Sequence, residues 1–297
     1  MADPAAAPAV TAAIVVLDGE RFIGEALASI RDQTFRDWEL VVVDDGSTDR
    51  TASLVEAFGA ERPGRVCLLR HPGGGNRGIA ASRNLAIARA RGRYVAFLDA
   101  DDVWLPEKLA EQVAILDADP ELGLVYGRSL IWYGWSPAAP RADHYYPLGV
   151  EADRRHEPPV LFELLMRNEA QTPTTCNAMI RRSLFDRLGP FDPRFRTMFE
   201  DLTFFAKALA TTPAYVSDRT WAKYRQHPES CTAVSAARGA DDLRRLRFLL
   251  WLGRSLPPEA RGPRVLAALA AERRRAARAV ARGFGRRLRR RLAGWIR

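Results

Sequence analysis

Cysteine is scarce in this chain of 297 residues, which holds only Cys67, Cys176 and Cys231. Three scattered cysteines are too few and odd in number for a disulfide framework, and their spacing matches no structural zinc site. The sequence therefore excludes a small disulfide-stapled protein. It fits a reducing compartment, in which buried free thiols are the expected state of these side chains.

Long hydrophobic runs are missing as well. No apolar stretch reaches the roughly 18 residues that a membrane-spanning helix needs. The first ten residues have no basic side chain before their apolar stretch, so we expect no secretory signal. These absences predict a cytoplasmic protein that is soluble or lies on a membrane surface.

Acidic residues are almost absent from the C-terminal segment 271–297, which has eleven arginines and one glutamate. Because the whole chain has a formal net charge of +9, everything before this segment is close to neutral. Val280, Phe284, Leu288 and Leu292 recur every four residues among the arginines, which predicts a basic amphipathic helix suited to an anionic membrane surface. The alternative is a helix packed on the domain with solvated arginines. We expect no nucleic-acid binding, because phosphate contacts do not require an apolar stripe.

Residues 13–126 alternate strand and helix patterns. Four continuous apolar strands are expected at 13–17, 38–43, 66–69 and 94–98, with amphipathic segments between them. This alternation predicts an α/β fold with a mostly parallel, doubly wound sheet and helices on both faces. In such sheets, ligands bind beyond the carboxyl ends of the strands.

The rest of the chain has weaker patterns. Residues 127–160 lack periodicity and are rich in aromatic side chains, so we expect a long connection over the mouth of the site. A second α/β-like stretch follows at 160–227. Residues 240–297 predict helices that are interrupted at Pro257-Pro258 and Gly262-Pro263.

Two acidic clusters directly follow predicted strands. Asp99 and Asp101 come after the strand 94–98, and carboxylates in this position suit a Mg²⁺ or Mn²⁺ ion that also binds substrate phosphates. Asp44 and Asp45 come after the strand 38–43, where they could accept hydrogen bonds from a base and a ribose. Ordinary turn and helix-cap chemistry is the alternative for both clusters. A capping role for Ser47 or Thr48 at the next helix is also expected.

A glycine-rich turn at 71–76 opens another predicted helix. Arg77, Arg83 and Asn84 lie around it, where basic side chains and free backbone N–H groups could meet phosphate. The glycine spacing matches neither a dinucleotide-binding turn nor a phosphate-binding P-loop. The alternative for Arg83 is a solvated position on the helix surface.

Four candidates lie further along the chain. Glu200 and Asp201 begin a predicted helix, where an acid either interacts with the helix dipole or acts as a general base. Arg225 and His227 follow a short strand pattern at 214–216 and could contact a metal or a diphosphate. A lone histidine is more often structural, so the residues alone leave this open.

These candidates occur in a fixed order with other short motifs. The motifs lie at 19–22, 33–35, 38–49, 83–84, 97–109, 200–201 and 224–227. As an ordered set they resemble the family 2 glycosyltransferases of GT-A fold, over about three quarters of the chain. The resemblance implies a GT-A glycosyltransferase domain at 10–232. That domain would have a nucleotide-binding half at 10–126, an acceptor-side half at 127–232, and a helical extension at 233–297.

The same resemblance implies inverting transfer of a sugar from a UDP- or GDP-sugar, with Mg²⁺ or Mn²⁺, to a glycan or lipid-linked acceptor. Asp201 would be the base, beside Glu200. Residues implied at the metal are Asp101, Asp99 and His227. Residues implied at the donor are Asp44, Asp45, Arg77, Arg83, Asp99 and Arg225. Aromatic residues at 131–146 could stack on sugar rings, and 271–297 would hold the protein at the inner face of the cytoplasmic membrane.

One segment departs from the family pattern. The family usually has Pro-x-Tyr-Asn where this chain has Val15-Val16-Leu17-Asp18, beside the expected nucleobase. This change leaves open which base is bound. It also makes a catalytically degenerate scaffold conceivable. A nucleotidyltransferase is a further alternative, although 17–21 lacks the basic triphosphate loop that such an enzyme needs.

Overall fold

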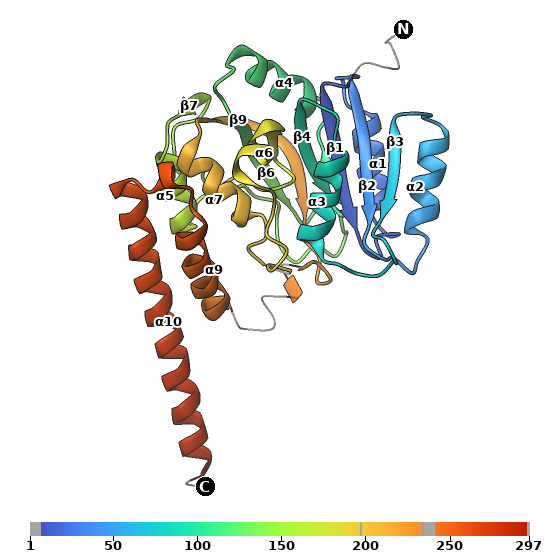
Figure 1. Cartoon of the computed structure of the whole chain (residues 1–297). Coiled ribbons are helices and arrows are strands. Elements are labelled where there is room, and N and C mark those ends of the chain that lie inside the picture. The colour runs from blue at the N-terminus through green and yellow to red at the C-terminus, as the bar shows by residue number, and fades with distance from the viewer. Residues whose placement is uncertain (1–6, 197, 232, 235–240, 296–297) are drawn as a thin grey trace.

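The computed structural model describes residues 7–196, 198–231, 233–234 and 241–295, with the backbone alone described for residue 241 and for 284–295. One sheet runs through the molecule with the strand order β3-β2-β1-β4-β8-β6-β9-β5, and β7 pairs with β9 (Figure 1). The strands are β1 (Val10–Val16), β2 (Trp38–Asp44), β3 (Val66–Arg70), β4 (Tyr94–Asp99), β5 (Val103–Trp104), β6 (Leu124–Trp132), β7 (Arg154–His156), β8 (Ala178–Arg181) and β9 (Ala214–Arg225).

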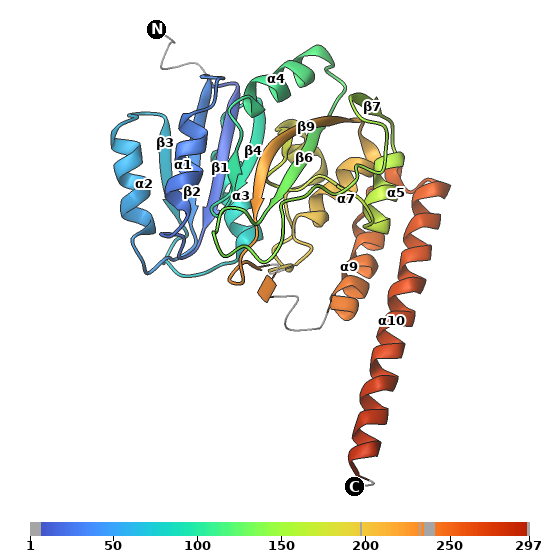
Figure 2. The same cartoon turned by 180° about the vertical axis from the view of Figure 1, so that it is seen from behind.

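Helices cover both faces of this sheet (Figures 1 and 2). They are α1 (Ile23–Arg31), α2 (Thr51–Ala60), α3 (Ile79–Arg89), α4 (Lys108–Ala118), α5 (Val160–Arg167), α6 (Ser183–Leu188), α7 (Leu202–Thr211), α9 (Asp241–Ser255), the 3₁₀ turn η1 (Pro258–Ala260) and α10 (Pro263–Trp295). Side chains alternate between the two faces of a strand, so Ala12 and Ile14 pack in one core while Ala13 packs in the other. The α/β fold class is confirmed.

The first four strands of the sheet are parallel, in the order β3-β2-β1-β4. Beyond β4 the sheet is mixed: β8 is antiparallel to β4 and β6, whereas β6 and β9 are parallel. Both β1 and β2 are almost wholly buried, which is why their sequences are continuously apolar.

Two expectations about local structure are wrong. The segment 127–160 is not one irregular connection, because β6 continues to Trp132 and β7 follows at Arg154. The polar residues Arg128 and Ser129 interrupt the apolar pattern of β6, although its pairing with β9 continues after a register shift. The expected helix cap is also wrong: α2 begins at Thr51, whose backbone N–H is accepted by Asp49 and not by Ser47 or Thr48.

The two long C-terminal helices confirm the helical prediction for this region. They lie side by side in both views, and α10 then extends past the rest of the molecule (Figures 1 and 2). Phe248, Leu249 and Leu252 of α9 belong to the same core as the helices α5 and α7. The apolar stripe predicted from Phe284 onward lies outside the described side chains. Within the described residues, no helix has the length and hydropathy that crossing a membrane requires.

Candidate active site

The two acidic clusters meet at the carboxyl edge of the parallel strands. Strand β1 lies between β2 and β4, and its last residues pair with the acids on both sides: Val15 with Asp99 and Val16 with Asp44. The clusters are therefore separated by the width of a single strand, which is about 10 Å from one outer strand to the other. A nucleotide bound at this edge can reach both.

Asp45 holds the glycine-rich loop in place. Its two carboxylate oxygens accept the backbone N–H groups of Arg77 (2.8 Å) and Gly78 (2.9 Å). Gly46 lies against the same loop with φ +99°, and a Cβ there would approach the backbone carbonyl carbon of Gly75 to 2.9 Å. Only glycine fits such a contact. Asp45 is thus buried in loop backbone, while the side chain of Arg77 is exposed.

Asp44 also accepts two hydrogen bonds from the protein. It accepts the backbone N–H of Ser47 at 2.8 Å and the Arg70 guanidinium Nε at 3.0 Å. Burial opposes its ionisation, but the hydrogen bonds from Ser47 and Arg70 outweigh burial and lower the pKa of Asp44. Hydrogen bonds therefore fix the side chains of both acids at this edge of the sheet.

Asp18 ends the segment that differs from the family pattern, and hydrogen bonds hold it against the loop after β2. Asp18 takes a left-handed conformation (φ +49°), and its carboxylate accepts the backbone N–H of Thr48 at 2.8 Å. In return, the backbone N–H of Asp18 donates to the Ser47 hydroxyl at 2.9 Å. These bonds explain why Ser47 and Thr48 do not cap α2. Asn and Asp tolerate this conformation better than other side chains, so Asp can stand here in place of Asn.

Arg83 is buried and joins the two halves of the site. Its side chain is 3% exposed and donates to the carboxylates of Asp99 (3.0 Å) and Glu200 (3.1 Å). The Thr175 hydroxyl accepts from Arg83 and donates to Asp99. Burial, opposed by the charge of Arg83, raises the pKa of Asp99. The solvated-surface alternative for Arg83 is therefore wrong.

Asp201 is the N-cap of α7, where its carboxylate accepts the backbone N–H of Leu202 at 2.8 Å. Burial, and next the charge of Glu200, raise the pKa of Asp201 to about 7. Phe199, two residues earlier, has a positive φ of 66°, which is rare for a bulky side chain. Its ring stacks on Phe248 of α9 with centroids 5.3 Å apart. The loop that presents Asp201 thus depends on α9.

Asp101 pairs with His227, whose Nε2 lies 2.9 Å from the Asp101 carboxylate. The other ring nitrogen of His227 is buried and has no hydrogen-bond partner. In the described part of the chain, no three His, Cys, Asp or Glu side chains form a metal-binding group. The pair still fits Mg²⁺ or Mn²⁺, which usually bind one or two protein groups and complete their shell with phosphates and water. Asp99 is directed to Arg83 instead.

Arg225 is buried, so its side chain is not free to contact a bound sugar donor. Its guanidinium lies over the rings of Trp132 (4.4 Å) and Phe22 (4.7 Å), and the residue is 2% exposed. The Nε atom donates to the backbone carbonyl of Asp101 at 2.6 Å. Arg225 therefore fixes the position of Asp101 from within the protein.

Sequence patterns missed two residues of this site. Thr175 bonds both Arg83 and Asp99, yet its only signal is a polar run before β8. Arg196 donates to the side chain of Asn76 at 3.0 Å and so connects the glycine-rich loop to the loop that presents Asp201. No pattern distinguishes Arg196 from the many surface arginines of this chain.

Comparison with known proteins gives a consistent result. Residues 11–189 match the family described as Glycosyl transferase family 2. The chain is 37% identical over 99 residues to the UDP-Glc:alpha-D-GlcNAc-diphosphoundecaprenol beta-1,3-glucosyltransferase WfgD of Escherichia coli, covering 33% of this chain and 37% of WfgD. It is 28% identical over 217 residues to the succinoglycan biosynthesis protein ExoW of Rhizobium meliloti (strain 1021), covering 72% and 63%.

A solved structure shares the architecture. The mannosyltransferase PcManGT from Pyrobaculum calidifontis, in complex with GDP-Man and Mn²⁺, aligns with a TM-score of 0.59 at 22% identity, covering 95% of this chain and 77% of that one. This likeness shows the fold. The chain spans less than two thirds of the length of either curated relative named above.

Proposed function

The chain belongs to glycosyl transferase family 2, and from this premise we propose that it is an inverting glycosyltransferase with a UDP- or GDP-sugar donor and a glycan or lipid-linked acceptor. The strongest support is the position of Asp201. Asp201 has a pKa of about 7 and directly follows Glu200, which Arg83 joins to Asp99. A proton acceptor and an acidic donor-binding edge thus face one site. The proposed catalytic domain is 10–232, with halves 10–126 and 127–232.

On the donor side, Asp101 and His227 would hold Mg²⁺ or Mn²⁺ together with the diphosphate of the donor. The bound ion would offset the negative charge that grows on the leaving diphosphate. Arg77, whose guanidinium is exposed beside the glycine-rich loop, is placed to contact the same phosphates. Asp44 and Asp45 would keep the wall of the nucleoside pocket rigid. Asp99, which Arg83 and Thr175 hold, would contact the ribose.

On the acceptor side, Asp201 takes the proton of the attacking hydroxyl. The hydroxyl oxygen forms its bond to the anomeric carbon while the bond to the diphosphate oxygen breaks, and the electron pair leaves with the diphosphate. Because attack and departure occur on opposite faces, the anomeric configuration inverts. Arg83 pairs with Glu200 and so prevents a second free carboxylate from competing for the proton.

WfgD is named for a diphosphoundecaprenol-linked acceptor, which favours a lipid-linked acceptor here as well. The basic segment 271–297 would bring the enzyme to the inner face of the cytoplasmic membrane, where such acceptors lie. Tyr145 and Tyr146 are exposed and could stack on acceptor sugars.

Calorimetry with UDP and GDP, each with and without Mn²⁺, tests the donor and metal together. We expect one nucleotide to bind in a Mn²⁺-dependent manner, and Asp101→Asn to remove the dependence on the metal. The matched variant Asp102→Asn would leave the pair of Asp101 and His227 in place. Absence of nucleotide binding under all conditions would overturn the proposed transferase and favour a degenerate scaffold.

A further inference from the structure

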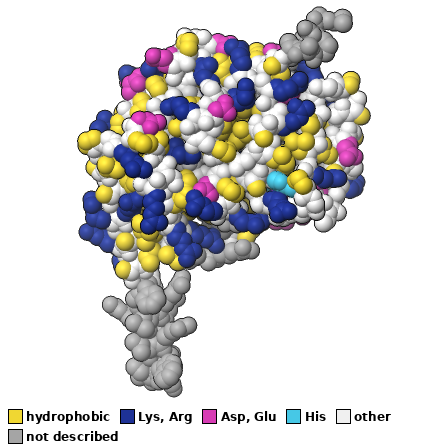
Figure 3. Space-filling model, in the orientation of Figure 1, with side chains coloured by type: hydrophobic (Ala, Val, Ile, Leu, Met, Phe, Trp, Pro, Cys, Tyr) yellow, Lys and Arg dark blue, Asp and Glu magenta, His cyan; other side chains and the backbone are white. Residues whose placement is uncertain are grey.

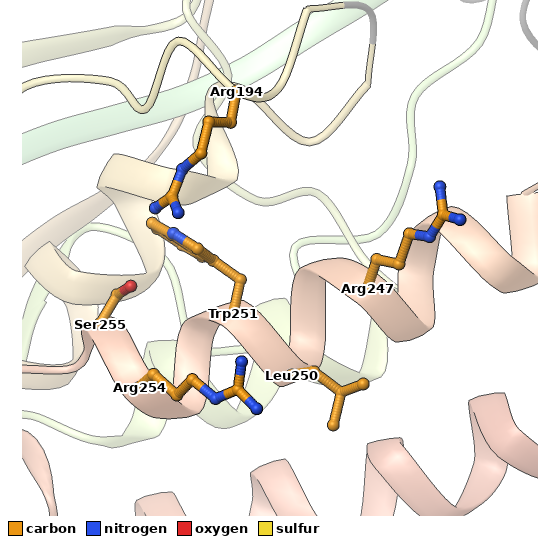
Figure 4. Close-up of a pocket in the computed structure, with 6 residues that line it drawn as sticks. All are labelled: Arg194, Arg247, Leu250, Trp251, Arg254 and Ser255. Atoms are coloured by element: carbon orange, nitrogen blue, oxygen red, sulfur yellow. The ribbon is translucent and has the colours of Figure 1, made fainter.

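A cavity of about 380 Å³ lies on the outer side of α9, away from the residues of the active site. Arg247, Trp251 and Arg254 recur at intervals of four and three residues, so they share one face of the helix. Arg194, from the loop after α6, closes the other side and reaches toward the ring of Trp251 (Figure 4). The cavity is lined mainly by guanidinium groups and one indole.

The charge of this cavity is not compensated. Arg194 is paired with Asp192, but Arg247 and Arg254 have no side-chain partner among the described residues. Both are exposed. The guanidinium groups of Arg247 and Arg254 point to different sides of α9 (Figure 4), so each can pair with a separate anionic group at a surface.

The wall of the cavity is rigid. Trp251 donates from its indole Nε1 to Asp192 at 2.9 Å, packs edge-on against Phe195 with centroids 5.2 Å apart, and stacks on Phe248. An indole with one polar and one apolar side is typical of residues at a membrane–water interface. The ring of Trp251 is therefore held in place by the protein itself.

Exposed leucines flank the arginines. Leu243 and Leu250 are each 44% exposed, and with Arg247 and Arg254 they form one stripe along α9. Leu250 also lines the cavity itself. A soluble phosphate would leave these apolar side chains exposed to water. A membrane lipid would bury them, because its acyl chains lie next to its headgroup.

The adjoining surface has the same charge. Figure 3 shows Lys and Arg side chains gathered over the region where α9 and α10 lie in Figure 1. On α10, Arg274, Arg278 and Arg282 are exposed at intervals of four residues and have no partner among the described residues. Arg273 of α10 donates to the Leu249 carbonyl beside the cavity.

We propose that this face of α9 binds the anionic headgroups of a membrane, with Arg247 and Arg254 pairing with separate lipid phosphates and Leu243 and Leu250 entering the interface beside them. This inference rests on the membrane contact in the proposed function, but it uses residues outside 271–297. It gives the membrane a defined binding site on the folded body of the protein in addition to the basic tail.

A second cavity provides the control. It is lined by Arg31, Arg36, Trp38, Glu61, Arg62, Pro63 and Arg65. Arg31 and Arg62 are paired with acids, and Arg36 and Arg65 donate to backbone carbonyls. Like the cavity on α9, this one is lined by a tryptophan and several arginines, but each of its four guanidinium groups has a hydrogen-bond partner. Substituting Arg36 and Arg65 removes the same charge from a surface that should not bind lipid.

The test is co-sedimentation of the full chain with phosphatidylcholine vesicles, with and without phosphatidylglycerol. We expect Arg247→Gln with Arg254→Gln to weaken binding to the anionic vesicles about tenfold, and Arg36→Gln with Arg65→Gln to change it less than twofold. Leu250→Gln should weaken it severalfold. Circular dichroism should show equal melting temperatures, because all these side chains are at the surface.

Three outcomes would overturn the inference. The first is equal vesicle binding by the α9 variant and the control variant. The second is saturable binding of inorganic phosphate that the α9 variant loses while its vesicle binding is unchanged, which would assign the site to a free anion. The third is an effect of the α9 variant on Mn²⁺-dependent nucleotide binding. A tail variant, Arg287→Gln with Arg290→Gln and Arg291→Gln, separately tests the membrane contact of the proposed function.

Discussion

The acids of the two halves of this site have the same side chain type and opposite environments. In the half that we propose binds the donor, Asp44 and Asp45 each accept hydrogen bonds from loop backbone, and the pKa of Asp44 is lowered. In the half that we propose binds the acceptor, burial raises the pKa of Asp201 to about 7. A carboxylate that stays ionised suits a fixed wall, whereas one that titrates near neutrality suits proton transfer.

The largest effect should come from Asp201→Asn, which removes the proton acceptor and keeps the shape of the side chain. We expect kcat to fall by about 10³-fold, with nucleotide affinity within about twofold of wild type because the donor wall is untouched. A nucleotide-release assay and calorimetry measure the two quantities. Glu200→Gln is the matched control and should lose much less. Transfer that survives in the Asp201 variant would assign the base elsewhere.

Arg83→Met should break the connection between the halves. It leaves the carboxylates of Asp99 and Glu200 without their shared partner, which we expect to cost about 3 kcal/mol of stability and most of the activity. Urea unfolding measures the first effect. Arg83→Lys keeps the charge but cannot reach both carboxylates, so it should restore stability only in part. Unchanged unfolding in Arg83→Met would show that the two halves are independent.

The pH dependence should separate the halves without a mutation. Below pH 7 Asp201 is increasingly protonated and cannot accept a proton, so kcat/KM should fall about tenfold for each pH unit below 7. The pKa of Asp44 is lowered, so protonation of this acid should not weaken nucleotide binding over the same range. Rate and calorimetric profiles from pH 5 to pH 9 test both statements. A flat rate profile would contradict the base assigned here.

Asp45→Ala should weaken nucleotide binding and leave the pH profile of the rate unchanged. The backbone N–H groups of Arg77 and Gly78 lose their acceptor, so the glycine-rich loop loses its fixed position. We expect nucleotide affinity to fall about tenfold, which corresponds to one or two lost hydrogen bonds, while the pH at half-maximal rate stays near 7. Asp45→Asn retains one acceptor oxygen and should lose less. A shift in the rate profile would mean that the loop also acts on Asp201.

Much of this could be predicted from the sequence, because each acidic cluster directly follows a continuous apolar strand. The strand pattern places Asp44, Asp45 and Asp99 at one edge of the sheet. It fails at β6 and β9, where polar residues such as Arg128 and Lys223 interrupt the pattern while the backbone pairing continues. A continuous apolar run marks a strand that is buried on both faces. β6 and β9 are only partly buried, so their sequences lack such a run.

The partners of the site residues could not be predicted in the same way. Arg225 packs between Phe22 and Trp132, which are far from it and from each other in the sequence. Arg83 has the surroundings of a surface arginine in the sequence, and only the fold brings Glu200 to it. Position along a strand is a local property, but the partner of a charge depends on the whole chain.

The stacked pair of Phe199 and Phe248 has a mechanical consequence. Phe248 lies beside Arg247 on α9, and Phe199 stands two residues before Asp201, so a displacement of this helix is transmitted over a short path to the carboxylate. Phe199 already holds a backbone conformation that its side chain disfavours, and the contact with Phe248 accompanies it. The stacked pair therefore joins α9 directly to the loop that carries Asp201.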